Sequence, residues 1–147
     1  MREVYRSAIT PYSAETMFDL IADIDSYSAF LPWCNESKIL SSSDDGAGQE
    51  VVASLGLAQG ALTGRFTTRN RNIRPSSILL KLIDGPFSDL EGEWKIKPLG
   101  DDGCKLELRM RFSFSNPLKD MLLGMVFEKT CNKLVDAFVT RAGQMDD

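Results

Sequence analysis

Carboxylates and cysteines are the side chains of this sequence that could carry chemistry, because the chain contains no histidine. This excludes serine–histidine and cysteine–histidine nucleophiles, histidine general bases and histidine-containing zinc sites. A carboxylate pair acting as general acid and base needs two side chains in one pocket with opposed pKa shifts. The carboxylates considered are Asp19, Asp23, Asp25, Asp84, Glu91 and Glu93. No pair among them meets this requirement on sequence grounds, so we predict no catalytic residue and a protein that is not an enzyme.

The cysteines predict neither a metal site nor a redox site. Cys34, Cys104 and Cys131 are odd in number and far apart, with no CxxC spacing. We expect them to be reduced and structural, which fits a cytoplasmic protein. No apolar run approaches the roughly 20 residues that cross a bilayer, and the first residues lack the apolar segment of a secretory signal. A peripheral position at the inner membrane stays open as an alternative.

Length and composition predict one globular domain over residues 1–147. A chain of 147 residues buries about 70% of its unfolded surface, so a core can form without disulfides. Hydrophobic residues make up 43% and charged residues 26%, both ordinary for globular proteins. The net charge of −4 and the pI of 4.9 oppose a general nucleic-acid binder, and no DNA partner is expected.

The N-terminal third reads as a strand followed by helices. A short strand is expected over Val4–Ile9, and Ser13 is a candidate N-cap of a helix. The apolar side of this helix has helical spacing and comprises Met17, Phe18, Leu20, Ile21 and Ile24. A second short helical piece then leads into an irregular segment, FLPWC, at residues 30–34.

From about residue 36 to residue 114 the apolar period is two, which indicates strands. We expect a turn over residues 41–48, one strand over residues 50–74, and further strands over residues 76–85, 89–100 and 104–115. In the last strand Leu106, Leu108, Met110, Phe112 and Phe114 alternate with polar residues. Short connections between these strands make the pairing antiparallel.

A long helix follows the strands, with Asn116 as N-cap and Pro117 as first helical residue. About 27 residues of helix would be about 40 Å long, enough to cross a sheet. Its first turns are apolar on nearly all sides, because Leu123 and Phe127 project opposite to Leu118, Met121, Leu122, Met125 and Val126. These turns are either buried on two sides, or they border a lipid-like ligand or a membrane surface with Met121 and Met125 as adaptable lining.

These elements predict an α+β fold in which a curved antiparallel sheet wraps around a long C-terminal helix. A wide sheet curled over one helix tends to leave a space between the two, which is where a ligand would bind. Two apolar loops lie outside the regular sheet, one with Trp33 and one with Phe87 after Gly85-Pro86. We interpret them either as the entrance of this cavity or as ordinary loop packing.

A second candidate site is a row of basic residues within residues 64–74. Arg65, Thr67, Arg69 and Arg71 share one face of an extended strand, and Phe66 and Thr68 share the other. A polar outer face of an antiparallel sheet is the ordinary explanation. The functional alternative is a phosphate contact, to lipid headgroups or to ribosomal RNA.

The motifs FLPWC, FTTRN and DGPFSDLEGEW, followed by a long terminal helix, resemble the coenzyme Q-binding START-like family (polyketide cyclase/RatA). The resemblance covers nearly the whole chain, and one departure is Ile96, where an aromatic residue is expected. It implies the helix-grip (START/Bet v 1-like) fold and a hydrophobic tunnel under the long helix. It also implies binding of ubiquinone or a similar isoprenoid, in support of quinone biosynthesis and respiration.

Three functions follow, and the first is preferred. The first is non-enzymatic binding of an isoprenoid ligand, most simply ubiquinone, with no required cofactor. The alternative is a RatA-like toxin that binds the large ribosomal subunit through Arg65, Arg69 and Arg71 and inhibits subunit association. A polyketide cyclase or aromatase is the third and the least favoured, because it would need polar groups inside the pocket and we expect few inward polar residues. The predicted ligand-binding residues are Phe30, Leu31, Pro32, Trp33, Phe66, Leu80, Phe87, Trp94, Leu108, Met110, Phe112, Met121 and Met125.

Overall fold

The computed structural model describes residues 1–145 and contains one antiparallel sheet of seven strands. The elements in chain order are β1 (Arg2–Thr10), α1 (Ala14–Ala22), the 3₁₀ helix η1 (Ile24–Ala29), β2 (Cys34–Asp44), β3 (Gln49–Gln59), β4 (Leu62–Ile73), β5 (Ser77–Asp84), β6 (Phe87–Leu99), β7 (Gly103–Phe114) and α2 (Pro117–Met145). The strand order is β1-β7-β6-β5-β4-β3-β2. Each strand from β2 to β7 thus pairs with its neighbour in sequence. β1 pairs with β7 and forms the edge of the sheet opposite β2.

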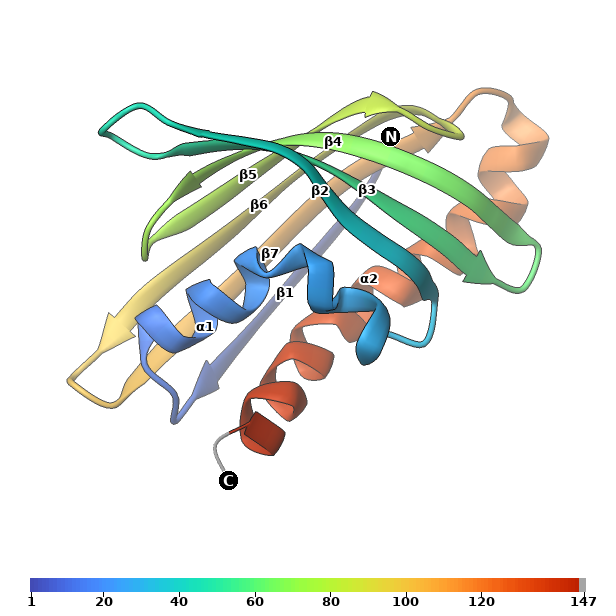
Figure 1. Ribbon diagram of the computed structural model, residues 1–147. Helices are drawn as coiled ribbons and strands as arrows, with labels where there is room; N and C mark the ends of the chain where they lie inside the picture. The colour runs from blue at the N-terminus through green and yellow to red at the C-terminus, as the bar shows by residue number, and fades with distance from the viewer. Residues whose placement is uncertain (146–147) are drawn as a thin grey trace.

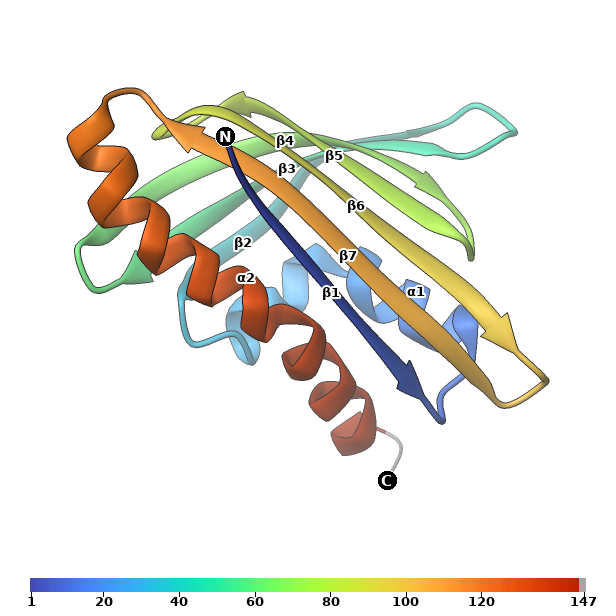
Figure 2. The same ribbon diagram turned by 180° about the vertical axis from the view of Figure 1, so that it is seen from behind.

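The sheet arches over the helices, which lie on its concave side (Figure 1). Seen from behind, α2 runs along the β1 edge of the sheet, and α1 with η1 lies beyond the strands (Figure 2). Irregular registers occur at three strand pairs, between β2 and β3, β4 and β5, and β6 and β7. Such bulges bend a strand and increase its twist, which accounts for part of the curvature. The predicted helix-grip architecture is confirmed.

Local signals place the helix starts where the sequence predicts them. The Ser13 hydroxyl accepts a hydrogen bond from the Thr16 N–H at 3.1 Å and caps α1. The Asn116 carboxamide oxygen accepts from the Lys119 N–H at 2.8 Å and caps α2. Each cap satisfies a backbone donor that has no partner within its helix.

The prediction of a single strand over residues 50–74 is wrong, because the chain reverses in the middle of it. Gln59 pairs with Leu62, and Gly60 between them adopts φ 58°. Glycine reaches this left-handed conformation without the steric cost that a Cβ would bring, so it permits the tight turn. The region therefore supplies two paired strands, β3 and β4, in place of one.

The predicted alternation of buried and polar residues is confirmed in β6 and β7. The inward-facing side chains of these strands form much of the core: Leu90, Trp94, Ile96, Leu106, Leu108, Met110, Phe112 and Phe114. Phe127, Val135 and Phe138 of α2 are buried against this core. The contact between the concave face and one side of α2 therefore determines where a cavity can form.

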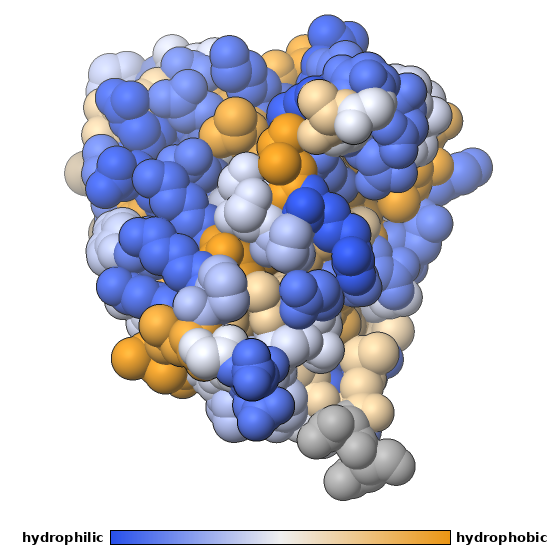
Figure 3. All heavy atoms as spheres, turned by 90° about the vertical axis from the view of Figure 1, so that its left-hand side faces the viewer, coloured by the Kyte–Doolittle hydropathy of each residue, from blue (hydrophilic) through white to orange (hydrophobic). Residues whose placement is uncertain are grey.

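The interpretation that the first turns of α2 are buried on two sides is wrong. Phe127 is buried, whereas the opposite side is exposed to solvent, with relative exposures of 62% for Leu118, 55% for Met121, 58% for Leu122 and 53% for Met125. The sheet covers only one side of the helix, and nothing else within residues 1–145 packs on the other. Figure 3 shows a different surface, at the left of Figure 1, where hydrophobic atoms occur as small groups among hydrophilic ones.

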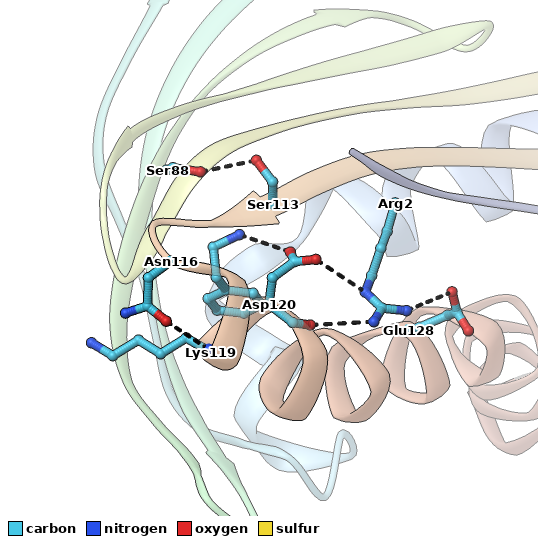
Figure 4. Close-up of polar contacts among 8 residues, drawn as sticks. Arg2, Ser88, Ser113, Asn116, Lys119, Asp120 and Glu128 are labelled. Atoms are coloured by element: carbon cyan, nitrogen blue, oxygen red, sulfur yellow. Dashed lines mark hydrogen bonds and ion pairs between the residues drawn. The ribbon is translucent and has the colours of Figure 1, made fainter.

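Arg2 fastens β1 to the first turns of α2 (Figure 4). Its guanidinium donates to the Asp120 carbonyl oxygen at 3.2 Å and lies 3.7 Å from the Glu128 carboxylate. The Asp120 carboxylate in turn accepts from the Phe114 N–H at 3.1 Å. These contacts tie the N-terminus of the helix to β1 and β7 at this end of the sheet.

Candidate functional site

A partly enclosed cavity of about 70 Å³ lies between the concave face of the sheet and the helices. Residues from α1, η1, β3 to β7 and α2 line it, and so does Trp33 in the loop before β2. Within the described part of the chain, no charged side chain is among the lining residues. The cavity therefore favours a neutral, mainly apolar occupant.

The structure brings together part of the predicted ligand-binding set. Trp33, Phe66, Leu80, Trp94 and Met110 all line the cavity. They come from four strands and one loop, and they meet because alternate residues of each strand point to the concave face.

Phe87 does not line the cavity and lies in an aromatic cluster of the core. Its ring centroid is 4.8 Å from those of Phe114 and Phe127 and 5.6 Å from that of Phe66. Burial of this ring in the core is the ordinary fate of a large aromatic side chain. Leu108 and Phe112 are fully buried and do not line the cavity either.

The FLPWC segment divides between core and cavity. The Phe30 ring packs edge to face on Phe138, with centroids 5.5 Å apart, and the Arg141 guanidinium lies 5.1 Å from its centroid. Leu31 is buried and Pro32 is exposed. Trp33 alone of this segment reaches the cavity, and its carbonyl oxygen accepts from the Ala58 N–H at 2.8 Å. The loop is thus attached to β3.

The structure places Met121 and Met125 outside the cavity. Both lie on the exposed side of α2, opposite the side that packs on the sheet. Because 3.6 residues make one turn, side chains three or four positions apart stay on one face, and this face points to solvent.

The cavity has a polar wall that the sequence analysis missed: Thr68, Asn70 and Asn72 of β4 and Thr130 of α2. All four side chains are buried. Thr68 donates to the Asn70 side-chain oxygen at 2.8 Å, and Thr130 donates to the Val126 carbonyl oxygen at 3.1 Å. Extending the two-residue period from Phe66 and Thr68 would have found Asn70 and Asn72. The expectation of few inward polar residues is therefore wrong.

The two titratable groups that line the cavity are both neutral at ordinary pH. Burial raises the pKa of the Cys131 thiol and of the Tyr27 hydroxyl. The Tyr27 hydroxyl also donates to the carbonyl oxygen of Ile21. Neither group acts as a general base in this state, since the thiolate and the phenolate are disfavoured by desolvation.

On the convex face, two of the three predicted phosphate-binding arginines are engaged by carboxylates. Arg65 donates to Glu36 at 2.6 Å, and Arg71 donates to Asp45 at 2.7 Å. Arg69 forms no ion pair within residues 1–145, and it lies opposite Lys81 in the β4–β5 register, which likewise forms none there. We call Arg69 and Lys81 the outer-face cation pair.

The cavity is small for a ring-sized ligand. An apolar cavity of about 150 Å³ holds benzene, and drug-sized ligands occupy about 300 Å³ or more. At about 70 Å³, the present volume requires movement of lining side chains before a ring enters. Trp33, Leu80 and Leu134 line the cavity and are only partly buried, so they can move at the least cost in lost contacts.

Comparisons with known proteins agree with this architecture. A family model described as "Polyketide cyclase / dehydrase and lipid transport" matches residues 10–139. The chain is 42% identical over 142 residues to "Ribosome association toxin RatA" of Pseudomonas aeruginosa, covering 97% of this chain and 96% of that protein. It is 29% identical over 147 residues to "Coenzyme Q-binding protein COQ10 homolog B, mitochondrial" of Xenopus laevis, covering 97% of this chain and 59% of that protein.

Among solved structures, a START superfamily protein from Mycobacterium smegmatis superposes with a TM-score of 0.78 at 22% identity. The match covers 97% of this chain and 98% of that chain. At this identity the likeness shows the fold alone. None of the helices within residues 1–145 combines the length and the apolar composition needed to cross a membrane.

Proposed function

The chain belongs to the polyketide cyclase / dehydrase and lipid transport family, and from this premise we propose that it is a ribosome-association inhibitor. It binds the large ribosomal subunit and thereby hinders subunit joining. The observation that carries this proposal is the 42% identity to a ribosome association toxin over nearly the full length of both chains. The 29% identity to a coenzyme Q-binding protein is lower and covers 59% of that protein.

The outer-face cation pair is our candidate for the contact with ribosomal RNA. Arg69 and Lys81 are exposed neighbours on adjacent strands. A phosphate placed between them would meet two positive charges without first breaking an ion pair. Arg65 and Arg71 would have to exchange Glu36 and Asp45 for phosphate, which reduces their net contribution. With a net charge of −4, binding has to depend on such a local site.

Cosedimentation with purified large subunits at stepped salt concentrations tests this proposal. The variant Arg69→Glu/Lys81→Glu should lose most of its binding and show a flatter salt dependence, since fewer counterions are released. The matched control is Lys129→Glu/Lys133→Glu, which makes the same charge change at exposed positions of α2. Retained binding by the control and loss by the sheet variant supports the proposal. Absence of wild-type binding, or equal loss in both variants, contradicts it.

A second function is favoured by the cavity itself: non-enzymatic binding of an isoprenoid ligand such as ubiquinone. The cavity is apolar, partly enclosed and free of charged lining groups within the described residues. Burial of apolar surface would provide the affinity, at about 25 cal/mol per Å² before the cost of ordering the ligand. One fold has room for both functions, because the cavity and the cation pair lie on opposite faces of the sheet.

Mass spectrometry of organic extracts from gently purified protein tests the second function. Ala53→Leu, at a buried position that lines the cavity, should fill it and abolish copurification of a quinone. Ala58→Leu adds the same atoms at an exposed position of the same strand and should leave copurification unchanged. A wild-type extract without any hydrophobic compound would count against this function and leave the ribosomal one untouched.

Neither proposed function requires catalysis, and we propose that the protein is not an enzyme. A cyclase or aromatase would need a group in the cavity that moves a proton near neutral pH. The polar wall consists of amides and hydroxyls, and Cys131 and Tyr27 stay protonated because burial raises the pKa of each. These groups can orient a ligand but are poor acids and bases.

A further inference from the structure

The side chain of Asn72 is buried in the cavity with an unused hydrogen-bonding atom. Asn72 is 4% exposed, and its Oδ1 has no hydrogen-bond partner within the described residues. A buried polar atom without a partner costs stability in proportion to its lost hydration. Such an atom in a cavity wall is a site at which a ligand group can restore the missing bond.

Other polar side chains of the wall already have hydrogen-bond partners, and Asn72 differs from them in this respect. The Asn70 oxygen accepts from the Thr68 hydroxyl, and the Thr130 hydroxyl donates within its own helix. Asn72 is paired in register with Ile78 of β5, another residue of the cavity lining. Within the described residues, Asn72 Oδ1 is the one side-chain oxygen of the polar wall that is buried without a partner.

We propose that the cavity recognises a hydroxyl group on an aromatic or quinol-type ring, and that this hydroxyl donates to Asn72 Oδ1. This inference rests on the second proposed function, the binding of an apolar ligand. A hydroxyl both donates and accepts, so it suits either orientation of the carboxamide. A group that only accepts, such as a quinone carbonyl, would leave Oδ1 unpaired.

The lining also explains why the hydroxyl should sit on a ring. Trp33, Phe66, Trp94, Phe127 and Phe138 all line the cavity, and aromatic side chains favour offset or edge-to-face contacts with a ring. The buried polar group then selects among rings of one size, since an analogue without the hydroxyl leaves Asn72 unpaired.

Phenol and toluene form a matched pair of probes, because they have the same number of non-hydrogen atoms. Calorimetric titration of the full-length protein should show phenol binding about tenfold more tightly than toluene, as expected for one restored buried hydrogen bond. Both tryptophans of the chain line the cavity, so shifts of their indole N–H resonances in NMR spectra would locate the bound probe.

Two variants attribute the preference to Asn72. Asn72→Leu keeps a similar volume, removes the unpaired oxygen and should abolish or reverse the tenfold preference. Asn132→Leu is the control, because it makes the same substitution at a residue of α2 that does not line the cavity, and it should keep the preference. Should Asn72→Leu fail to fold, Asn72→Gln, which shifts the carboxamide by one methylene, should weaken phenol binding and spare toluene.

The outcomes separate the hydroxyl inference from the second proposed function on which it rests. If toluene binds as tightly as phenol, or if Asn72→Leu retains the preference, the hydroxyl inference fails while ligand binding by the cavity stands. If neither probe binds the wild-type protein, both the inference and the second proposed function fail. Ribosome cosedimentation is unaffected by either result.

Discussion

The ring of Trp94 on β6 meets the ring of Phe138 on α2 edge to face, with centroids 5.5 Å apart and planes at 88°. Both side chains are buried and both line the cavity. Phe138 also forms T-shaped ring contacts with Tyr27 and Phe30. One residue of the terminal helix thus joins the sheet, the 3₁₀ helix and the FLPWC segment, and it sets the spacing of the walls around the cavity.

Phe138→Ala should lower the free energy of unfolding by about 3–5 kcal/mol, the usual cost of removing a fully packed phenylalanine. Guanidinium denaturation followed by circular dichroism measures the change. Met125→Ala on the exposed side of the same helix should change the free energy by no more than about 0.5 kcal/mol. Equal effects of the two substitutions would show that the helix does not hold the sheet through Phe138.

Gly124→Ala should destabilise the protein even though alanine is the better helix former. A Cβ at this position would lie 3.0 Å or less from the Nε, Cδ and Cζ atoms of Arg2. The Arg2 guanidinium would have to leave its contacts with Asp120 and Glu128. Urea denaturation of the variant and the wild type measures the loss.

When the Arg2 side chain is removed, Gly124→Ala should stabilise the protein instead of destabilising it. In an Arg2→Ala background the steric conflict is absent, and Gly124→Ala should then stabilise by up to about 1 kcal/mol through helix propensity. The four proteins form a double-mutant cycle whose coupling free energy isolates the contact. A stabilising Gly124→Ala in both backgrounds would refute the assigned role of Arg2.

The β2–β3 hairpin should weaken in acid through Asp45. Hydrogen bonds from Arg71 and from the Ala47 and Gly48 N–H groups lower the pKa of this carboxyl from 3.8 to about 2. Because the folded-state pKa is the lower one, the stabilisation is complete above about pH 4 and is lost as pH falls towards 2. Asp45→Asn should therefore lower the denaturation midpoint at pH 5 and have little effect at pH 2. Asp89→Asn, at an exposed carboxylate without an ion pair within residues 1–145, is the control.

The three cysteines should resist thiol reagents while the protein is folded. Cys34, Cys104 and Cys131 are all buried, and burial raises the pKa of each thiol. At pH 8 Ellman's reagent should label none of them within minutes, and should label all three in urea. Ser42→Cys, at an exposed position of β2, should react at once and calibrate the assay. Fast labelling of the native wild type would indicate that the core opens frequently.

The sequence by itself determined the features that depend on near neighbours along the chain. Ser13 and Asn116 cap their helices through bonds to residues three positions away, so spacing alone reveals them. The side chains from Leu106 to Phe114 alternate because successive residues of a strand face opposite ways. The same kind of local periodicity predicts the helix after Pro117. Together, these elements predict the fold class.

Tertiary structure decided how these elements meet. Phe87 lies in the core because Phe114 and Phe127 surround it, and Arg65 is neutralised by Glu36, 29 positions away. Neither partnership has a signal in local spacing. The alternation along β4 placed Asn72 inward, but only the folded chain shows that its Oδ1 has no partner within the described residues. Pairing and packing join residues distant in sequence, and therefore only the folded chain distinguishes a cavity wall from solid core.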